Sequence, residues 1–73
     1  MFYIINKNAD FIRSHSRWGS PEAVHLGDAW ENKRYADKFR TKAEAETQLA
    51  IWAHNNDFKG RVIDEQTTLE MGA

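Results

Sequence analysis

Histidines are the first side chains to consider for chemistry, because the chain has no cysteine. Without thiolates, a metal site needs histidines and carboxylates at ligand spacing. His15, His25 and His54 are scattered along the chain, and no His-x-x-x-His pair or similar spacing occurs. Asp28 adds one carboxylate three residues after His25, which does not complete a ligand set. The sequence therefore predicts no metal site and no other cofactor.

A hydrolytic site of the Ser/His/Asp kind is formally available, because Ser14, His15 and Ser16 place two hydroxyls beside an imidazole. The chain has no nucleophile elbow and no Gly-rich oxyanion loop, and no Gly-rich run opens a helix to hold phosphates. A fold of this size also encloses little concave, water-excluded volume. We therefore predict a protein that is not an enzyme, and a small enzyme is the third alternative.

The segment from Arg13 to Trp18 is the best candidate for binding a partner. It places Arg13, Arg17 and Trp18 in an irregular stretch with serines and a glycine around them. Trp and Arg are over-represented at interface hot spots, and loops on a rigid scaffold often carry binding residues. The alternative, that Trp18 folds back as a lid over a thin core, stays open. We predict that Arg13, Arg17 and Trp18 form part of the partner-binding surface.

Charge bears on whether that partner is a nucleic acid. Residues 1–42 contain eight Lys and Arg against five Asp and Glu, whereas residues 43–73 contain two against six. The positive half could contact phosphates, and its aromatic residues could stack on bases. The sequence pI is about 6.3, however, whereas nucleic-acid-binding domains usually have a pI above about 9. A small nucleic-acid-binding accessory protein is therefore the second alternative.

The length of 73 residues allows one domain, and a chain of this size buries only roughly 60% of its unfolded surface. Three Trp, four Phe and two Tyr supply most of the bulk for a core. Association with a partner or with a second copy would stabilise a fold whose core is this thin, so a homodimer is one option.

The first strand is predicted at residues 2–5, Phe-Tyr-Ile-Ile, which are apolar on both alternating faces. Residues 6–10 contain turn-forming Asn and Asp, and residues 11–13 resume a strand pattern. We expect the two runs to pair as a β-hairpin.

Residues 14–40 leave several interpretations open. A helical turn could begin at Ser20, with Pro21 at the first helical position, or residues 24–26 could form a strand. Asp28 and Glu31 have the spacing of a capping box, which favours a short helix at 29–38. The alternation of Tyr35, Asp37 and Phe39 favours an edge strand instead. Trp30, which lies among charged residues, is interpreted as a lid over the core.

The main helix is the clearest element. Thr41 and Glu44 form a capping-box pattern, and good helix formers follow until Asn55 and Asn56. One stripe of this helix, comprising Ala45, Leu49, Trp52 and Ala53, is predicted to pack on the sheet. Ile51 falls on the opposite side, and we predict that it contributes to the partner-binding surface. A last strand is expected at 61–64, after a turn at 57–60, and residues 66–73 are expected to fray.

These elements predict a single small α+β domain over residues 1–73. The expected architecture is a three- to four-stranded, mainly antiparallel sheet with one long helix packed on one face. No apolar run approaches the 18 residues of a membrane span, and the N-terminus lacks the features of a secretory signal. We therefore expect no membrane partner and a cytoplasmic location.

The order of these elements is similar to that of short bacteriophage and prophage proteins. The shared features are an N-terminal Tyr3-Ile4-Ile5 strand, a mid-chain Trp, the run Ala36-x-x-Phe39-x-Thr41-x-x-x-Ala45 before the main helix, and a final Val-Ile strand. Several anti-CRISPR proteins and other host-defence inhibitors have this size and a β-β-α-β build. The resemblance implies a phage protein that binds and blocks a bacterial host complex in the host cytoplasm, such as a CRISPR or other defence complex.

Overall fold

The computed structural model of the chain describes residues 1–14, 19–24 and 29–64. The elements in chain order are β1 (Phe2–Asn6), β2 (Ile12–Ser14), β3 (Pro21–Ala23), α1 (Ala29–Tyr35), α2 (Lys42–Asn56) and β4 (Gly60–Asp64). The α+β class is therefore confirmed, with α2 as the main helix.

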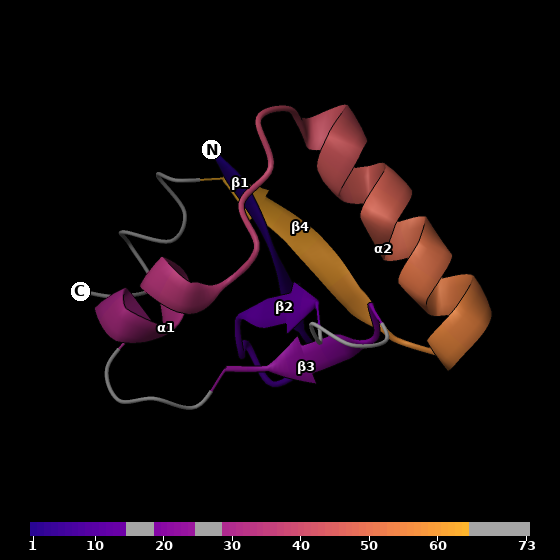
Figure 1. Cartoon of the computed structure of the whole chain (residues 1–73), viewed down its shortest axis with the longest axis horizontal. Helices are drawn as coiled ribbons and strands as arrows, with labels where there is room; N and C mark the ends of the chain where they lie inside the picture. Colours follow the sequence, from indigo (N-terminus) through magenta and orange to yellow (C-terminus); the bar gives the residue numbers. More distant parts are fainter. Residues whose placement is uncertain (15–18, 25–28, 65–73) are drawn as a thin grey trace.

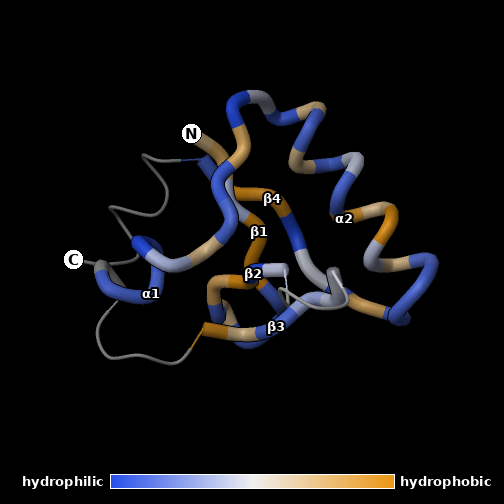
Figure 2. Tube along the Cα trace, viewed as in Figure 1, coloured by the Kyte–Doolittle hydropathy of each residue, from blue (hydrophilic) through white to orange (hydrophobic). Residues whose placement is uncertain are grey.

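The centre of the fold is an antiparallel ribbon of β1 and β4, which lies between the two helices (Figure 1). The register pairs Phe2 with Asp64 and Asn6 with Gly60. The hydrophobic colour is concentrated on β1, the start of β2 and part of β4, whereas α1 is largely hydrophilic and α2 alternates between hydrophilic and hydrophobic residues (Figure 2). Because β1 is apolar on both alternating faces, it can bury side chains toward α1 and toward α2 at once.

Each face of the ribbon has its own cluster of buried side chains. On one face, Ile4 packs with Ala45 and Trp52 from α2. On the other face, Tyr3 and Ile5 pack with Phe11, Ala36 and Ile63, and the Lys33 ammonium of α1 lies 5.8 Å from the centre of the Tyr3 ring. Two thin layers therefore take the place of one large core, as expected for a chain of this length.

The prediction of a three- to four-stranded sheet is wrong, because the strands form two separate sheets of two strands. In the second sheet, β2 pairs with β3 from Ile12–Ala23 to Ser14–Pro21. The predicted hairpin of β1 and β2 is reduced to one isolated bridge, between Ile5 and Phe11.

The second edge of β1 explains this difference. Phe2 and Phe39 exchange two backbone hydrogen bonds of 2.8 and 2.9 Å, so residue 39 occupies that edge at its beginning. The 6–10 turn brings only Phe11 back to the same edge. β2 then leaves β1 and satisfies its backbone groups by pairing with β3.

The open interpretations of residues 14–40 are resolved differently along the segment. No helical turn starts at Pro21, which instead begins the edge strand β3, a position that proline tolerates. A short helix, α1, is present. The alternative edge strand predicted for residues 35–39 is reduced to one isolated bridge, between Phe2 and Phe39. Residues 25, 26 and 28 lie outside the described residues, as do the predicted tail 66–73 and the side chain of Trp30.

The predicted Thr41 cap and the end of the main helix are confirmed, but the Glu44 carboxylate accepts from the Arg40 N–H at 3.3 Å rather than from the Thr41 N–H that a capping box predicts. The Thr41 hydroxyl accepts a hydrogen bond of 3.1 Å from the Glu44 N–H, and α2 ends at Asn56. The packing stripe is narrower than predicted. Ala45 and Trp52 are buried and Leu49 is half-buried, but Ala53 is exposed, because the ribbon is only two strands wide.

Replacing Thr41 with alanine should lower the free energy of unfolding by roughly 0.5–2 kcal/mol, because the Glu44 N–H loses its partner. Thr47→Ala is the matched control. Thr47 is exposed within the same helix, and its hydroxyl bonds only to the Ala43 carbonyl of the preceding turn. Urea denaturation of both variants is the measurement, and an equal midpoint for the two would contradict the assignment of Thr41 as the cap.

In the part of the chain that the structure describes, no helix has the length and apolar character required to span a bilayer.

Candidate functional site

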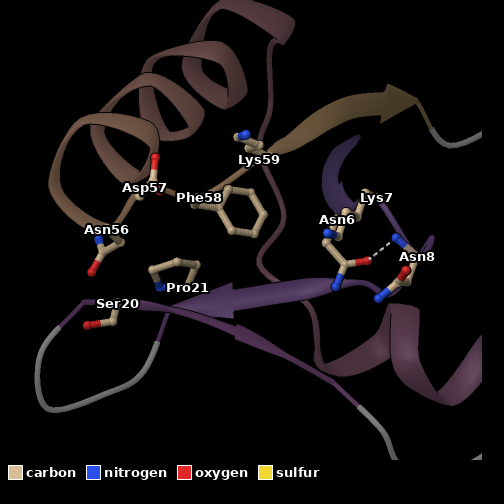
Figure 3. Close-up of a pocket in the computed structure, with 9 residues that line it drawn as sticks. All are labelled: Asn6, Lys7, Asn8, Ser20, Pro21, Asn56, Asp57, Phe58 and Lys59. Atoms are coloured by element: carbon tan, nitrogen blue, oxygen red, sulfur yellow. Dashed lines mark hydrogen bonds between the residues drawn. The ribbon is translucent and has the colours of Figure 1, made fainter.

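A cleft of about 650 Å³ opens where three turns of the fold meet (Figure 3). These turns are the β1–β2 turn, the segment that enters β3, and the connection between α2 and β4. The residues that line the cleft are Asn6, Lys7, Asn8, Ser20, Pro21, Asn56, Asp57, Phe58 and Lys59. Most of them are polar turn-formers, so the cleft is built from the ends of the elements rather than from their faces.

The β1–β2 wall is held by the side chain of Asn6. Its Oδ1 accepts hydrogen bonds of 2.9 Å from the backbone N–H groups of Asn8 and Asp10. Its Nδ2 donates to the Asp10 carboxylate at 3.2 Å. The amide of Asn6 is thereby engaged inside the turn, a role for which asparagine is well suited. Asn6 therefore shapes the wall, and Lys7 and Asn8 are the residues that the wall presents.

The β3 wall is tied to α2 by one long-range hydrogen bond. The Trp52 indole Nε1 donates to the Gly19 carbonyl at 2.8 Å, across 33 positions of the sequence. Gly19 has a φ of 68°, a left-handed conformation that glycine adopts without steric cost. The bond fixes the chain immediately before Ser20 and Pro21, and so sets the position of this wall.

The floor of the cleft is the ring of Phe58. It meets Trp52 edge-to-face, with 5.7 Å between ring centroids and 73° between planes. Asp57 ends α2 in the left-handed conformation, and the Phe58 N–H donates back to the Trp52 carbonyl at 3.4 Å. The Cε2 and Cζ atoms of the ring also lie against Gly60, where a side chain would collide with them. Phe58 is thus fixed by the helix end and by the first residue of β4.

The remaining lining groups are available for a ligand. Within the described ranges, the side chains of Lys7, Asn8, Ser20, Asn56, Asp57 and Lys59 form no hydrogen bond or ion pair. A second cleft of about 240 Å³ continues past Lys7 and Lys59 to Gly60 and Arg61. Among their described lining residues, the two clefts together carry three cationic side chains and one carboxylate, that of Asp57.

This set of groups is suited to hydrogen bonding and charge pairing. The lysines and Arg61 donate, Asp57 accepts, and the Asn amides and the Ser20 hydroxyl do both. The lining residues that the structure describes include no histidine. Among residues 1–14, 19–24 and 29–64, no three His, Asp or Glu side chains gather in a way that could hold a metal ion.

The predicted site residues lie elsewhere or outside the described residues. Arg13 projects from β2, and its Nε is 3.0 Å from the Glu22 carboxylate on β3, with both side chains partly exposed. Ile51 is 46% exposed on the outer side of α2. Arg17 and Trp18 fall outside the described residues. Neither of the two described residues, Arg13 and Ile51, lines the cleft, and the part of all four in partner binding stays a prediction.

Sequence reasoning missed the cleft residues, because turn-forming Asn, Asp and Lys were interpreted only as connectors. A weak signal was present, since Lys7 and Lys59 occupy two separate polar turns. Pairing Asn6 with Gly60 in the β1–β4 ribbon is what makes those turns neighbours.

No protein-family model, curated protein or solved structure matches this chain. Function is therefore inferred from the cleft and its side chains.

Proposed function

We propose that this is a non-enzymatic binding protein that engages another protein through the cleft between the β1–β2 turn, β3 and the α2–β4 connection. The observation that carries the proposal is a contrast within the cleft. The groups that shape its walls are bonded internally, whereas the groups that face the opening have no partner in the described parts of the chain.

Such an arrangement favours binding for an energetic reason. Association costs free energy for every loop that must become ordered, and about 0.5–1.5 kcal/mol for each long side chain that becomes immobilised. The three walls of the cleft are already ordered by folding. The contacts that order them are the hydrogen bonds of the Asn6 turn, the Trp52–Gly19 hydrogen bond and the packing of Phe58 on Trp52. A partner therefore binds to backbone turns that are already in position, and binding has to immobilise only the ends of the exposed side chains.

The resemblance to short phage proteins supports a bacterial host protein complex as the first partner to test. In this proposal the protein binds and modulates a host complex, such as a CRISPR or other defence assembly, in the host cytoplasm. Arg13, Arg17, Trp18 and Ile51 would add contacts outside the cleft.

The test is affinity capture from a bacterial lysate with wild-type protein and two matched variants, followed by mass spectrometry. Asn8→Ala combined with Asn56→Ala removes two amides that face the cleft. Asn55→Ala removes the same side chain from the neighbouring exposed position of α2, which does not line the cleft.

A specific partner should be retained by Asn55→Ala and lost by the double variant. With purified partner, the affinity should fall at least about tenfold, which corresponds to about 1.4 kcal/mol. Equal capture by the double variant and the wild type would contradict the cleft as the binding site.

A further inference from the structure

We infer that the chemical feature recognised by the cleft is an acidic protein segment, whose carboxylates pair with Lys7, Lys59 and Arg61. This inference rests on the proposed function and adds the chemistry of the partner to it. The larger and the smaller cleft share Lys7 and Lys59, and Arg61 lines the smaller one. The three cations therefore line one continuous surface.

The strand register explains why the cations gather. Asn6 pairs with Gly60 at the last position of the β1–β4 ribbon, and Ile5 pairs with Arg61 one position earlier. Lys7 directly follows the end of β1, and Lys59 directly precedes the start of β4. Two lysines from distant parts of the chain are thus adjacent to this end of the ribbon, and Arg61 is on the same strand.

These cations differ from several others in the described chain in what surrounds them. Arg13 pairs with Glu22 at 3.0 Å, and Lys42 pairs with Glu46 at 3.9 Å. Lys38 donates to the Arg34 carbonyl at the end of α1. Lys7, Lys59 and Arg61 have no such partner within the described ranges. Among the described residues that line these two clefts, Asp57 has the one carboxylate. A carboxylate of a bound partner would supply the ion pairs that these three cations lack.

The neutral groups of the cleft favour a polypeptide over a nucleic acid. The amides of Asn8 and Asn56 can donate to and accept from a peptide backbone, and the Asp57 carboxylate can accept from a peptide N–H. Stacking of bases requires an open aromatic face, but Phe58 is half-buried, with Trp52 and Gly60 against it.

The experiment is amide chemical-shift mapping with blocked synthetic probes of equal length. The probes are an alternating Glu-Gly octapeptide, its Gln-Gly analogue, its Lys-Gly analogue and oligothymidylate. We expect the Glu-Gly peptide to shift the amides of residues 6–8 and 57–61 with a Kd of about 0.1–1 mM, the range of a few exposed charge contacts. The Gln-Gly peptide should bind at least about tenfold more weakly, and added salt should weaken the Glu-Gly peptide.

Charge variants supply the second part of the test. Lys59→Gln combined with Arg61→Gln should weaken the Glu-Gly peptide about tenfold, whereas the surface control Lys42→Gln should leave it unchanged. Lys59→Glu combined with Arg61→Glu should shift the preference to the Lys-Gly peptide. The urea midpoint of each variant shows that the fold is retained, and both altered residues are exposed.

Each contrary result has a distinct meaning. Equal binding of the Gln-Gly peptide at the same amides would overturn the acidic preference and leave the proposed protein-binding function intact. Stronger binding of oligothymidylate would make a nucleic acid the partner and would overturn both. If no probe shifted these amides, the inference would fail, while the capture experiment with Asn8 and Asn56 variants would still decide the proposed function.

Discussion

Trp52→Ala is expected to unfold most of the protein. Trp52 is 0% exposed and is the largest fully buried side chain among the residues whose burial the structure describes. Truncating a buried Trp costs about 3–5 kcal/mol. A chain of this length has a total stability of about 4–11 kcal/mol, at the usual 0.05–0.15 kcal/mol per residue. Circular dichroism and urea denaturation should show a largely unfolded chain or a strongly lowered midpoint.

Two further variants separate the roles of the Trp52 side chain. Trp52→Phe keeps an aromatic ring but removes the N–H that binds the Gly19 carbonyl, and should cost about 1–3 kcal/mol. Ile51→Ala is the matched control, because Ile51 is the adjacent residue on the exposed side of α2, and it should change stability by less than about 0.5 kcal/mol. If Trp52→Ala were as mild as Ile51→Ala, the assignment of the buried face of α2 would be wrong.

Gly60→Ala is expected to damage both the fold and the cleft. A Cβ at this position would lie 2.6 Å from Cε2 and 2.9 Å from Cζ of Phe58, and it would also collide with the Ile5 carbonyl oxygen. The Ile5 carbonyl belongs to the backbone of the central strand β1. Removing both collisions therefore requires the end of the β1–β4 ribbon to open and the Phe58 ring to move away from residue 60. Overpacking of this kind costs typically 1–3 kcal/mol.

Urea denaturation and amide hydrogen exchange near residues 5 and 60 measure this effect. Gly19→Ala is an informative comparison, because a Cβ there meets no atom within 4 Å and the cost is only that of the left-handed backbone, about 1 kcal/mol. Adding Phe58→Leu to Gly60→Ala should recover part of the loss, since the collision with the Ile5 carbonyl remains. Full recovery would show that only the ring constrains position 60, and no loss at all would contradict the close approach.

Elements with a strong local signal were predicted correctly from the sequence. The Thr41 cap, the end of α2 at Asn56 and the strand from residue 2 depend on neighbouring residues, which the chain itself displays. The final strand was predicted within one residue of its observed start at Gly60. Propensity, capping and alternation act over a few positions, so the sequence contains the information that decides them.

Strand pairing was not decided locally. β1 could in principle pair with residues 11–13, and a hairpin was the simplest expectation. It pairs along its full length with β4 instead, and its other edge is shared between Phe11 and Phe39. The choice depends on which arrangement covers both faces of β1 at once, with Trp52 on one side and Ala36 on the other. That is a property of the whole packed chain.

The candidate site shows the same division. The types of residue in each turn, their charges and the absence of thiols can be read directly from the sequence. Only the tertiary structure brought residues 6–8, 20–21 and 56–59 to one cleft and left Lys7 and Lys59 facing it. The physical reason is that the β1–β4 register and the Trp52–Gly19 hydrogen bond join segments that are far apart along the chain. Local sequence patterns do not predict which turns these long-range contacts bring next to one another.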